Sequence, residues 1–223
     1  TGGSEITIGI GQVLGIRVQE NFNRPYFSKN ITEYWRRWHI SLGSWFRDYI
    51  YIPLGGNRVS TGRHIRNILV VWALTGLWHG ASWNFVFWGV YYGLLLLAEK
   101  FLLGRFLETA PVWLRNLYTM FAVIIGWVFF SQTTPAAIGK MLGAMFGLGA
   151  SCFADRASLY ALKSGLILMI ISVISCRPGL YQYFKRLARR NTYLAAVINA
   201  ILFFLCIAYM IYSSYTPFMY QQF

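Results

Sequence analysis

The sequence predicts an all-α, polytopic membrane protein with about five to six transmembrane spans and further amphipathic helices at the membrane interface. Hydrophobic residues make up 57% of the 223 positions and charged residues only 12%, whereas soluble domains usually carry roughly 25% charged residues. Several apolar runs approach the ~20 residues that a helix needs to cross a bilayer. The aromatic content of 18% fits this class, because Trp and Tyr gather where the membrane meets water.

The net charge of +13 is explained by membrane topology. Nucleic-acid binding is another common reason for a basic chain, but a polyanion-binding surface does not need several long apolar runs, so no nucleic acid is expected as a partner. Three segments, 19–66, 99–116 and 177–192, hold 16 of the 20 Lys and Arg residues. If residues 67–98 cross the bilayer twice and each later apolar segment crosses once, these segments share one side, which the positive-inside rule makes cytoplasmic.

The remaining apolar segments follow one another along the chain. Residues 1–18 are predicted to end a membrane helix, and the further spans are predicted at 117–132, 158–176 and 193–215. A Gly- and Ala-rich connection at 133–157 is expected to hold a short interfacial helix. Because the sequence starts inside an apolar stretch, we expect it to be a part of a longer protein.

His79 is the first candidate for catalysis. It is the only His, Lys, Arg, Asp or Glu within residues 67–98, and an ionisable side chain inside a membrane is costly enough to indicate function. A neutral imidazole can take a proton from a hydroxyl near neutral pH. The alternative is a histidine that only joins neighbouring helices by hydrogen bonds. The segment is too short for two spans of ~20 residues, so we expect a helix break near Gly76–Gly80, with His79 beside it.

His39 is the second candidate, and it lies in the amphipathic segment 19–66. The aromatic residues of the run 35–49 recur at helical spacing and share a face with His39, while the arginines gather elsewhere around the helix. This pattern is typical of a helix that lies in the membrane interface. We expect Thr32 to cap the N-terminus of this helix and Pro53 to end the region.

Other motifs exclude several classes of site. His64 is flanked by Arg63 and Arg66 and is expected to be a solvated loop residue. The segment 53–58 lacks the spacing of a phosphate-binding loop and is predicted to be a turn. The three cysteines show no CxxC spacing, so no metal site is expected. The absence of a GxSxG motif and of paired carboxylates in the spans argues against serine hydrolases and glycosidases, and leaves direct transfer to a hydroxyl that a base activates.

Four stretches together resemble the membrane-bound O-acyltransferase family, and most closely its bacterial alginate O-acetyltransferase branch. The match is dense from about residue 4 to residue 100, looser through the later spans, and returns at the chain's end. Because family members are longer, the resemblance implies that residues 1–223 are the C-terminal catalytic portion, without the N-terminal spans. The stretches are 21–26 (NFNRPY), 35–42 (WRRWHISL), 45–56 (WFRDYIYIPLGG) and 77–81 (LWHGA), joined by the ending 217–223 (PFMYQQF).

The resemblance implies an activity that composition does not show. The family's essential His of the WHG motif falls on His79, and its upstream His of the WxxWHxS segment falls on His39. In the family both histidines line a tunnel in which a cytosolic acyl donor meets an acceptor hydroxyl. For this branch the expected donor is acetyl-CoA, with no other cofactor, and the acceptor route leads to an extracytoplasmic polysaccharide such as alginate. The protein is then expected in the bacterial inner membrane, with an extracytoplasmic SGNH-type acyltransferase as partner.

Further side chains around the two histidines are expected to bind the substrates. Arginine suits phosphate, so arginines at the cytoplasmic mouth are candidates for holding the phosphates of CoA; contact with anionic lipid is the alternative. Trp78 is expected to form a bulky wall beside the WHG histidine, and Arg47 with Asp48 to form either part of the site or a local ion pair. The predicted substrate-binding set is Arg36, Arg37, Trp38, Arg47, Asp48, Arg58 and Trp78.

Two functions of other classes are alternatives to acyl transfer. One is a transporter or flippase for a lipid-linked sugar, in which a buried histidine relays protons. Internal repeats would favour it, and the sequence shows none. The other is a structural subunit with no chemistry of its own. An acetyl-transfer assay in membranes distinguishes the three functions.

Overall fold

The computed structural model describes residues 2–149, 154–175 and 178–212, and within them all regular elements are helical apart from one isolated bridge between Phe22 and Trp38. This confirms the predicted all-α class. The chain divides into two compact units, Thr1–Ala150 and Ser151–Phe223, which are described separately below.

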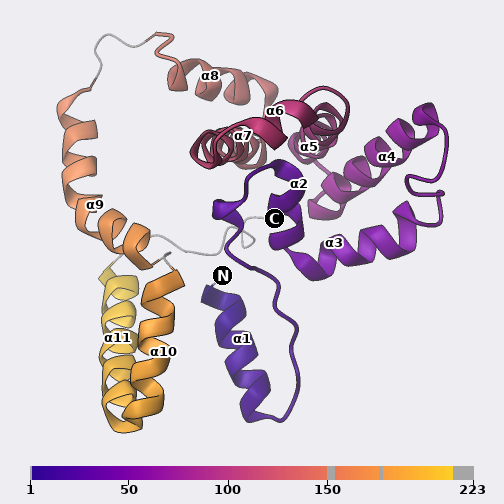
Figure 1. The fold of residues 1–223 in the computed structure, drawn as a ribbon. Helices are drawn as coiled ribbons and strands as arrows, with labels where there is room; N and C mark the ends of the chain where they lie inside the picture. Colours follow the sequence, from indigo (N-terminus) through magenta and orange to yellow (C-terminus); the bar gives the residue numbers. More distant parts are fainter. Residues whose placement is uncertain (1, 150–153, 176–177, 213–223) are drawn as a thin grey trace. The chain divides into compact units, whose positions relative to one another are not determined.

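The first unit is built around a hairpin of two long helices, α4 and α5 (Figure 1). Helix α5 also packs against α2 and α7, so it is the central element of the unit. In chain order the elements are α1 (Gly2–Val13), η1 (Pro25–Phe27), α2 (Ile31–Arg37), α3 (Ile40–Phe46), η2 (Arg47–Tyr51), α4 (Thr61–His79), α5 (Trp83–Phe101), α6 (Gly104–Thr109), α7 (Val112–Ser131) and α8 (Pro135–Met145).

The α4–α5 hairpin confirms the predicted break after the WHG histidine. Each helix has 19 residues, or about 28 Å at 1.5 Å per residue. The hairpin is longer than the apolar segment predicted from the sequence, because its helices continue into polar residues at both ends. Its helices approach closely at Gly76 and Gly89, where a Cβ would strike the backbone of Phe85 and Trp72, respectively. Such small residues bring helix backbones together in membranes.

The predicted single helix over 35–49 is wrong, because the chain breaks at His39. Helix α2 ends before it, α3 begins after it, and His39 itself has a φ of 49°, in the left-handed region. The predicted cap is also wrong, because Asn30, and not Thr32, accepts from the backbone N–H of Glu33, at 2.6 Å. Thr32 lies inside α2. The region nevertheless ends near Pro53, in the predicted turn.

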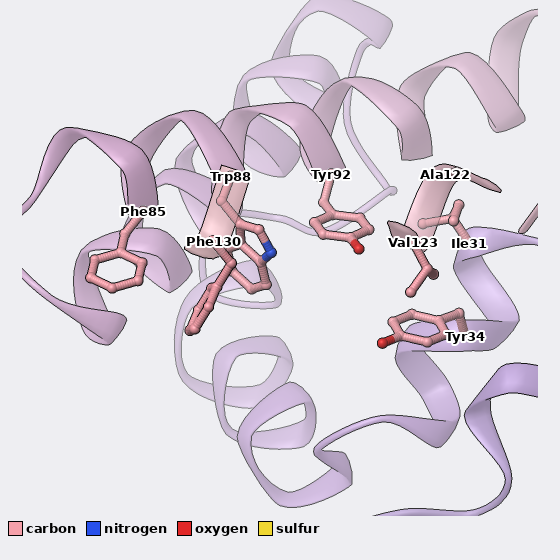
Figure 2. Packing of buried hydrophobic residues seen from close by; sticks show 8 residues of the cluster. All are labelled: Ile31, Tyr34, Phe85, Trp88, Tyr92, Ala122, Val123 and Phe130. Atoms are coloured by element: carbon pink, nitrogen blue, oxygen red, sulfur yellow. The ribbon is translucent and has the colours of Figure 1, made fainter. Parts of the chain in front are cut away.

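An aromatic core holds α2, α5 and α7 together (Figure 2). Its rings meet mostly edge to face, as Trp88 and Phe130 do with centroids 5.6 Å apart, an arrangement that the ring quadrupoles favour. The core fixes the short helix α2 against the two long helices, and α2 leads directly to His39. The buried members are Ile31, Tyr34, Phe85, Trp88, Tyr92, Ala122, Val123 and Phe130.

The second unit contains three helices, α9 (Arg156–Ser175), α10 (Pro178–Arg190) and α11 (Thr192–Tyr212). Helix α10 replaces most of the basic loop that the sequence predicted at 177–192, and it packs against α11. It is strongly amphipathic, with Lys185, Arg186, Arg189 and Arg190 in its second half. Two of the cysteines, Cys152 and Cys176, and the C-terminal stretch 217–223 lie outside the described residues.

Three of the described helices are long and apolar enough to cross a membrane: Val112–Ser131 in α7, Arg156–Ile174 in α9 and Thr192–Tyr209 in α11. They coincide with three of the predicted spans. Helices α4 and α5 have span length but are rich in Trp, Tyr, Gly and polar residues, which lower their hydropathy. The chain is thus a multi-pass membrane protein, and the two helices of the hairpin that carries the WHG histidine are not among these three.

Candidate active site

The catalytic candidate His79 is the last residue of α4, and Gly80 lets the chain turn at once toward α5. Gly80 has a φ of 156°, and a Cβ there would come within 2.7 Å of the Phe85 ring. Any other residue at this position would therefore clash with Phe85 or move the turn. The Gly of the WHG motif thus sets the place of the histidine at the end of its helix.

The imidazole of His79 is half-buried among aromatic rings from three helices. Its centroid lies 5.0 Å from that of Trp78 in α4, 4.9 Å from that of Trp88 in α5, and 5.2 Å from that of Phe130 in α7. Each of the three rings meets the imidazole nearly at right angles. These contacts fix the orientation of the imidazole in apolar surroundings, where a proton acceptor is shielded from bulk water.

His39 lies at the elbow between α2 and α3 and faces the same region. Its ring is 6.1 Å from that of Phe22 and 5.8 Å from that of Trp78, centroid to centroid. Within the described residues its Nδ1 is buried and has no hydrogen-bond partner. Burial lowers the pKa of His39 below its ordinary value, so the neutral imidazole is favoured near neutral pH. A left-handed backbone at a residue other than Gly costs about 1–3 kcal/mol and is found most often where function maintains it.

The structure brings the two predicted catalytic histidines together. Trp78 contacts both rings, at centroid distances of 5.8 Å for His39 and 5.0 Å for His79. Forty positions separate His39 from His79 in the sequence, and the aromatic core brings them together by packing α2 against α5. Two imidazoles that contact the same indole make an arrangement in which one base and one hydrogen-bonding group can address the same substrate.

A cavity of about 590 Å³ opens beside His39, between the α2–α3 elbow and the α4–α5 hairpin. Its volume lies within the ~300–1,000 Å³ of small-molecule and cofactor sites. Its walls are mainly apolar, and its polar side chains are few: His39, Arg36, Arg47, Thr32, Tyr51 and Thr75 among them. Thr75 is four residues, or one helical turn, before His79, so the cavity reaches the turn of α4 next to the second histidine.

The arginines of the predicted binding set separate into two groups. Arg36 and Arg47 line the cavity. Arg37 forms an ion pair with Glu33 at 2.6 Å along α2. Arg58 is exposed in the turn before α4. Neither of these two arginines lines the cavity. The geometry therefore leaves two cationic side chains facing the cavity.

The other members of the set also have distinct surroundings. Asp48 pairs with Arg47 at 2.7 Å, and hydrogen bonding from this guanidinium lowers the pKa of the Asp48 carboxyl. This matches the ion pair expected from the sequence. Trp38 stacks on Tyr34 at 5.7 Å and belongs to the aromatic packing. Trp78 is 54% exposed, so part of its ring is free to contact a bound molecule.

His64 was expected to be a solvated loop residue, and this prediction is wrong. It lies in the first turn of α4 with 5% of its surface exposed. Its Nε2 is 3.0 Å from the hydroxyl of Tyr51 and 3.5 Å from the Nζ of Lys100. Tyr51 belongs to η2 and Lys100 to α5, so His64 connects its own helix α4 to these two elements. Tyr51 also lines the cavity. Its neighbours Arg63 and Arg66 gave no sign of this burial.

Glu99 is a buried group that was not predicted from the sequence to be part of the site. It has 5% of its surface exposed and accepts from the backbone N–H of Ile31 and of Thr32 at the start of α2. The signal that could have identified it was an acidic residue directly after an apolar run that ends in Leu97 and Ala98. No group of three or more His, Cys, Asp or Glu gathers in the described ranges 2–149, 154–175 and 178–212.

Comparisons with known proteins identify the family of the chain. The model of the membrane-bound O-acyltransferase family matches residues 3–138, which include the elbow, the hairpin, both histidines and the cavity. The chain belongs to the membrane-bound O-acyltransferase family.

Curated relatives refine this assignment. The chain is 42% identical to the probable alginate O-acetylase AlgI of Azotobacter vinelandii over 191 residues, which cover 83% of this chain and 38% of the relative. It is 39% identical to the peptidoglycan O-acetyltransferase of Helicobacter pylori, over 66% of this chain and 29% of the relative. It is 34% identical to the teichoic acid D-alanyltransferase of Bacillus subtilis, over 42% of this chain and 26% of the relative. The chain therefore spans well under half the length of these relatives.

Proposed function

We propose that this chain supplies the acyl-transfer centre of a membrane-embedded O-acetyltransferase. The observation that carries the proposal is the convergence of His39 and His79 on Trp78, next to a cavity with two arginines. The rival transporter function explains one buried histidine as a proton relay. It does not require a second histidine at a strained elbow or cationic side chains beside an apolar cavity.

His79 acts as the general base in this proposal. It takes the proton from the acceptor hydroxyl as the hydroxyl oxygen attacks the thioester carbonyl of the donor. The C–O bond forms, the C–S bond breaks, and the imidazolium returns the proton to the departing thiolate. A sugar hydroxyl is a poor nucleophile until a base accepts its proton, and such general-base catalysis contributes about 10²–10⁴-fold to the rate.

His39 is proposed to orient the reacting groups. A neutral imidazole donates a hydrogen bond from one ring nitrogen. An N–H group aimed at the thioester oxygen stabilises the negative charge that develops there. The left-handed backbone of His39 and the packing of its ring against Phe22 and Trp78 fix its direction. Such pre-organisation is what an oxyanion-stabilising group requires.

The donor is proposed to be acetyl-CoA, with its phosphates near Arg36 and Arg47. Both side chains line the cavity, and guanidinium groups bind phosphate through paired N–H donors. The apolar walls suit the uncharged arm that carries the thioester. Arg37 and Arg58 are assigned no contact with the donor here, because neither lines the cavity.

The acceptor is proposed to be a hydroxyl on the route to an extracytoplasmic polysaccharide such as alginate. Support comes from the relatives, whose names refer to alginate, peptidoglycan and teichoic acid, all polymers of the cell envelope. The corresponding location is the bacterial inner membrane. An extracytoplasmic SGNH-type acyltransferase, as in the branch that the sequence resembles, is the proposed partner.

The test uses inner-membrane vesicles that contain the full-length protein expressed from its gene. Acetyl-CoA labelled in the acetyl group is supplied on the cytoplasmic side, and label is measured in the hydroxyl-linked acetyl esters of the envelope polymer. Vesicles without the protein are the control. Label that depends on the protein supports acetyl transfer. Translocation of a lipid-linked sugar without acetyl incorporation would instead establish the transporter function.

A further inference from the structure

Glu99 places a buried carboxylate at the start of α2. Its Oε2 accepts from the backbone N–H of Thr32 at 2.9 Å and from the Thr32 hydroxyl at 2.8 Å, and its Oε1 accepts from the backbone N–H of Ile31. The glutamate is in the last turns of α5, 67 positions further along the chain than Thr32. A long-range contact thus satisfies two of the free N–H groups that begin every helix.

This carboxylate is stabilised by α2 and not by a cation. The ion pairs of the described ranges join Arg37 to Glu33 and Arg47 to Asp48, and Glu99 belongs to neither. An isolated buried carboxylate is costly. Two backbone N–H donors, a hydroxyl and the positive end of a helix offset that cost. Removal of the charge therefore weakens the attachment of α2 to α5 directly.

The attachment lies on the path to the active site. Helix α2 ends at Arg37, only two residues before His39. Helix α5 carries Glu99 near one end and, about three turns earlier, Trp88, whose ring contacts His79 at 4.9 Å. One rigid helix therefore fixes the surroundings of His79 through Trp88 and the position of His39 through Glu99 and α2.

We propose that Glu99 is a positioning residue for His39, which it holds at catalytic distance from His79 by anchoring the start of α2 to α5. The inference rests on the proposed acyl-transfer function. Glu99 touches no reacting atom. Its effect passes through the α2 backbone, which leads to His39 and also carries the cavity-lining Arg36, so it alters both the turnover step in which His39 participates and the affinity for the donor.

The experiment is a double-mutant cycle between Glu99→Gln and His39→Ala in the full-length protein in membranes. Gln has nearly the same size, but its amide presents an NH₂ group to one of the α2 donors. Glu99→Gln is expected to lower kcat roughly 10- to 100-fold, because a misplacement of about 1 Å can cost 10²-fold. The KM for acetyl-CoA is expected to rise as well, because α2 also carries Arg36 beside the cavity, so the diagnostic result is the dependence of the kcat loss on His39.

In the His39→Ala background, Glu99→Gln is expected to lower kcat by less than about twofold. Residues that act as one unit show such non-additivity. Tyr91→Phe is the matched control, because it removes a different hydrogen bond of α5, from the Tyr91 hydroxyl to the Ala122 carbonyl at 2.8 Å. The control is expected to keep the wild-type kcat, in both backgrounds.

An equal loss from Glu99→Gln in both backgrounds would overturn the proposal, because a general structural defect acts regardless of His39. If Glu99→Gln does not accumulate in membranes, Glu99→Asp decides. It keeps the charge but is one methylene shorter, and it is expected to show a smaller, equally non-additive loss of kcat. A wild-type kcat for Glu99→Asp, or an additive loss, would contradict the proposal. A wild-type protein without any transferase activity would contradict the proposed function instead.

Discussion

The two units of the chain use apolar helices in opposite ways. Helices α9 and α11 of the second unit have mean hydropathies of 1.9 and 2.1, and none of their span windows is buried inside the protein. Helix α7 of the first unit has a mean hydropathy of 1.5, and 28% of its window is buried. Helices α4 and α5 supply the close glycine contacts and much of the aromatic core. The most apolar of these helices, α11, is therefore one of the two whose span windows are not buried.

The physical reason lies in the bilayer. Lipid tails are as apolar as Leu, so an apolar surface gains little from leaving lipid for another helix. Helix pairs associate instead through close backbone contact, ring packing and hydrogen bonds. The unit with more Gly, Trp and polar residues is thus the one that can hold two histidines in a fixed geometry. The candidate active site accordingly lies in the unit that contains the close glycine contacts and the aromatic core.

The sharpest test of this comparison exchanges one glycine in each unit. Gly89→Ala in α5 would place a Cβ against the Trp72 backbone, whereas Gly165→Ala in α9 meets nothing within 4 Å. Overpacking costs about 1–3 kcal/mol. We therefore expect Gly89→Ala to lower the thermal stability of the protein in detergent. We also expect it to lower the acetyl-transfer rate by roughly tenfold or more. Gly165→Ala is expected to match the wild type in both measurements, and equal effects of the two changes would contradict the comparison.

A loss of similar size is expected from His39→Ala. Its imidazole is proposed to orient and polarise, and not to accept the proton, so kcat should fall by roughly 10- to 100-fold, less than for loss of a general base. Single-turnover rates in membranes measure this, normalised to the amount of protein. An effect as large as that of the corresponding change at His79, at equal expression, would contradict the ranking of the two histidines.

The smallest effect is expected at the cavity's arginines. Arg36→Ala removes one guanidinium from the cavity lining and should raise the KM for acetyl-CoA by roughly tenfold, the change that about 1.4 kcal/mol produces. Its kcat should change little. Arg63→Ala, an exposed arginine at the start of α4, is the matched control and should leave KM unchanged. An unchanged KM with a reduced kcat in Arg36→Ala would show that this side chain maintains the elbow instead.

The local features of the site could be predicted from the sequence. The isolated charge-capable residue in an apolar run predicted His79 as a candidate, and the shortness of the segment 67–98 predicted a helix break near Gly76–Gly80, which the structure contains after His79. The predicted spans at 117–132, 158–176 and 193–215 correspond to α7, α9 and α11. Each of these signals depends on residues close together in the chain.

The features that were missed depend on residues far apart. Thr32 and Asn30 are both good capping residues; Asn30 caps α2, while the hydroxyl of Thr32 binds Glu99, which reaches it from α5. His64 is buried because Tyr51 and Lys100 reach it from other elements. The elbow at His39 has no Gly or Pro to indicate it. Hydrogen bonds from a distant segment flank it: the backbone N–H of Asn23 donates to the Arg37 carbonyl at 2.9 Å, and that of Ile40 donates to the Asn21 carbonyl at 3.0 Å.

The most direct test of the account is the acetyl content of the envelope polymer in cells that carry His79→Ala. Wild type and variant are expressed in a strain that lacks the enzyme, and the amount of each protein in the membrane is measured in parallel. We predict normal insertion, because an interhelical hydrogen bond in a membrane contributes only about 0.6 kcal/mol on average. We also predict that acetyl esters fall to the level of the strain without the enzyme. Wild-type acetyl content with the variant in the membrane would contradict the assignment of His79 as the general base.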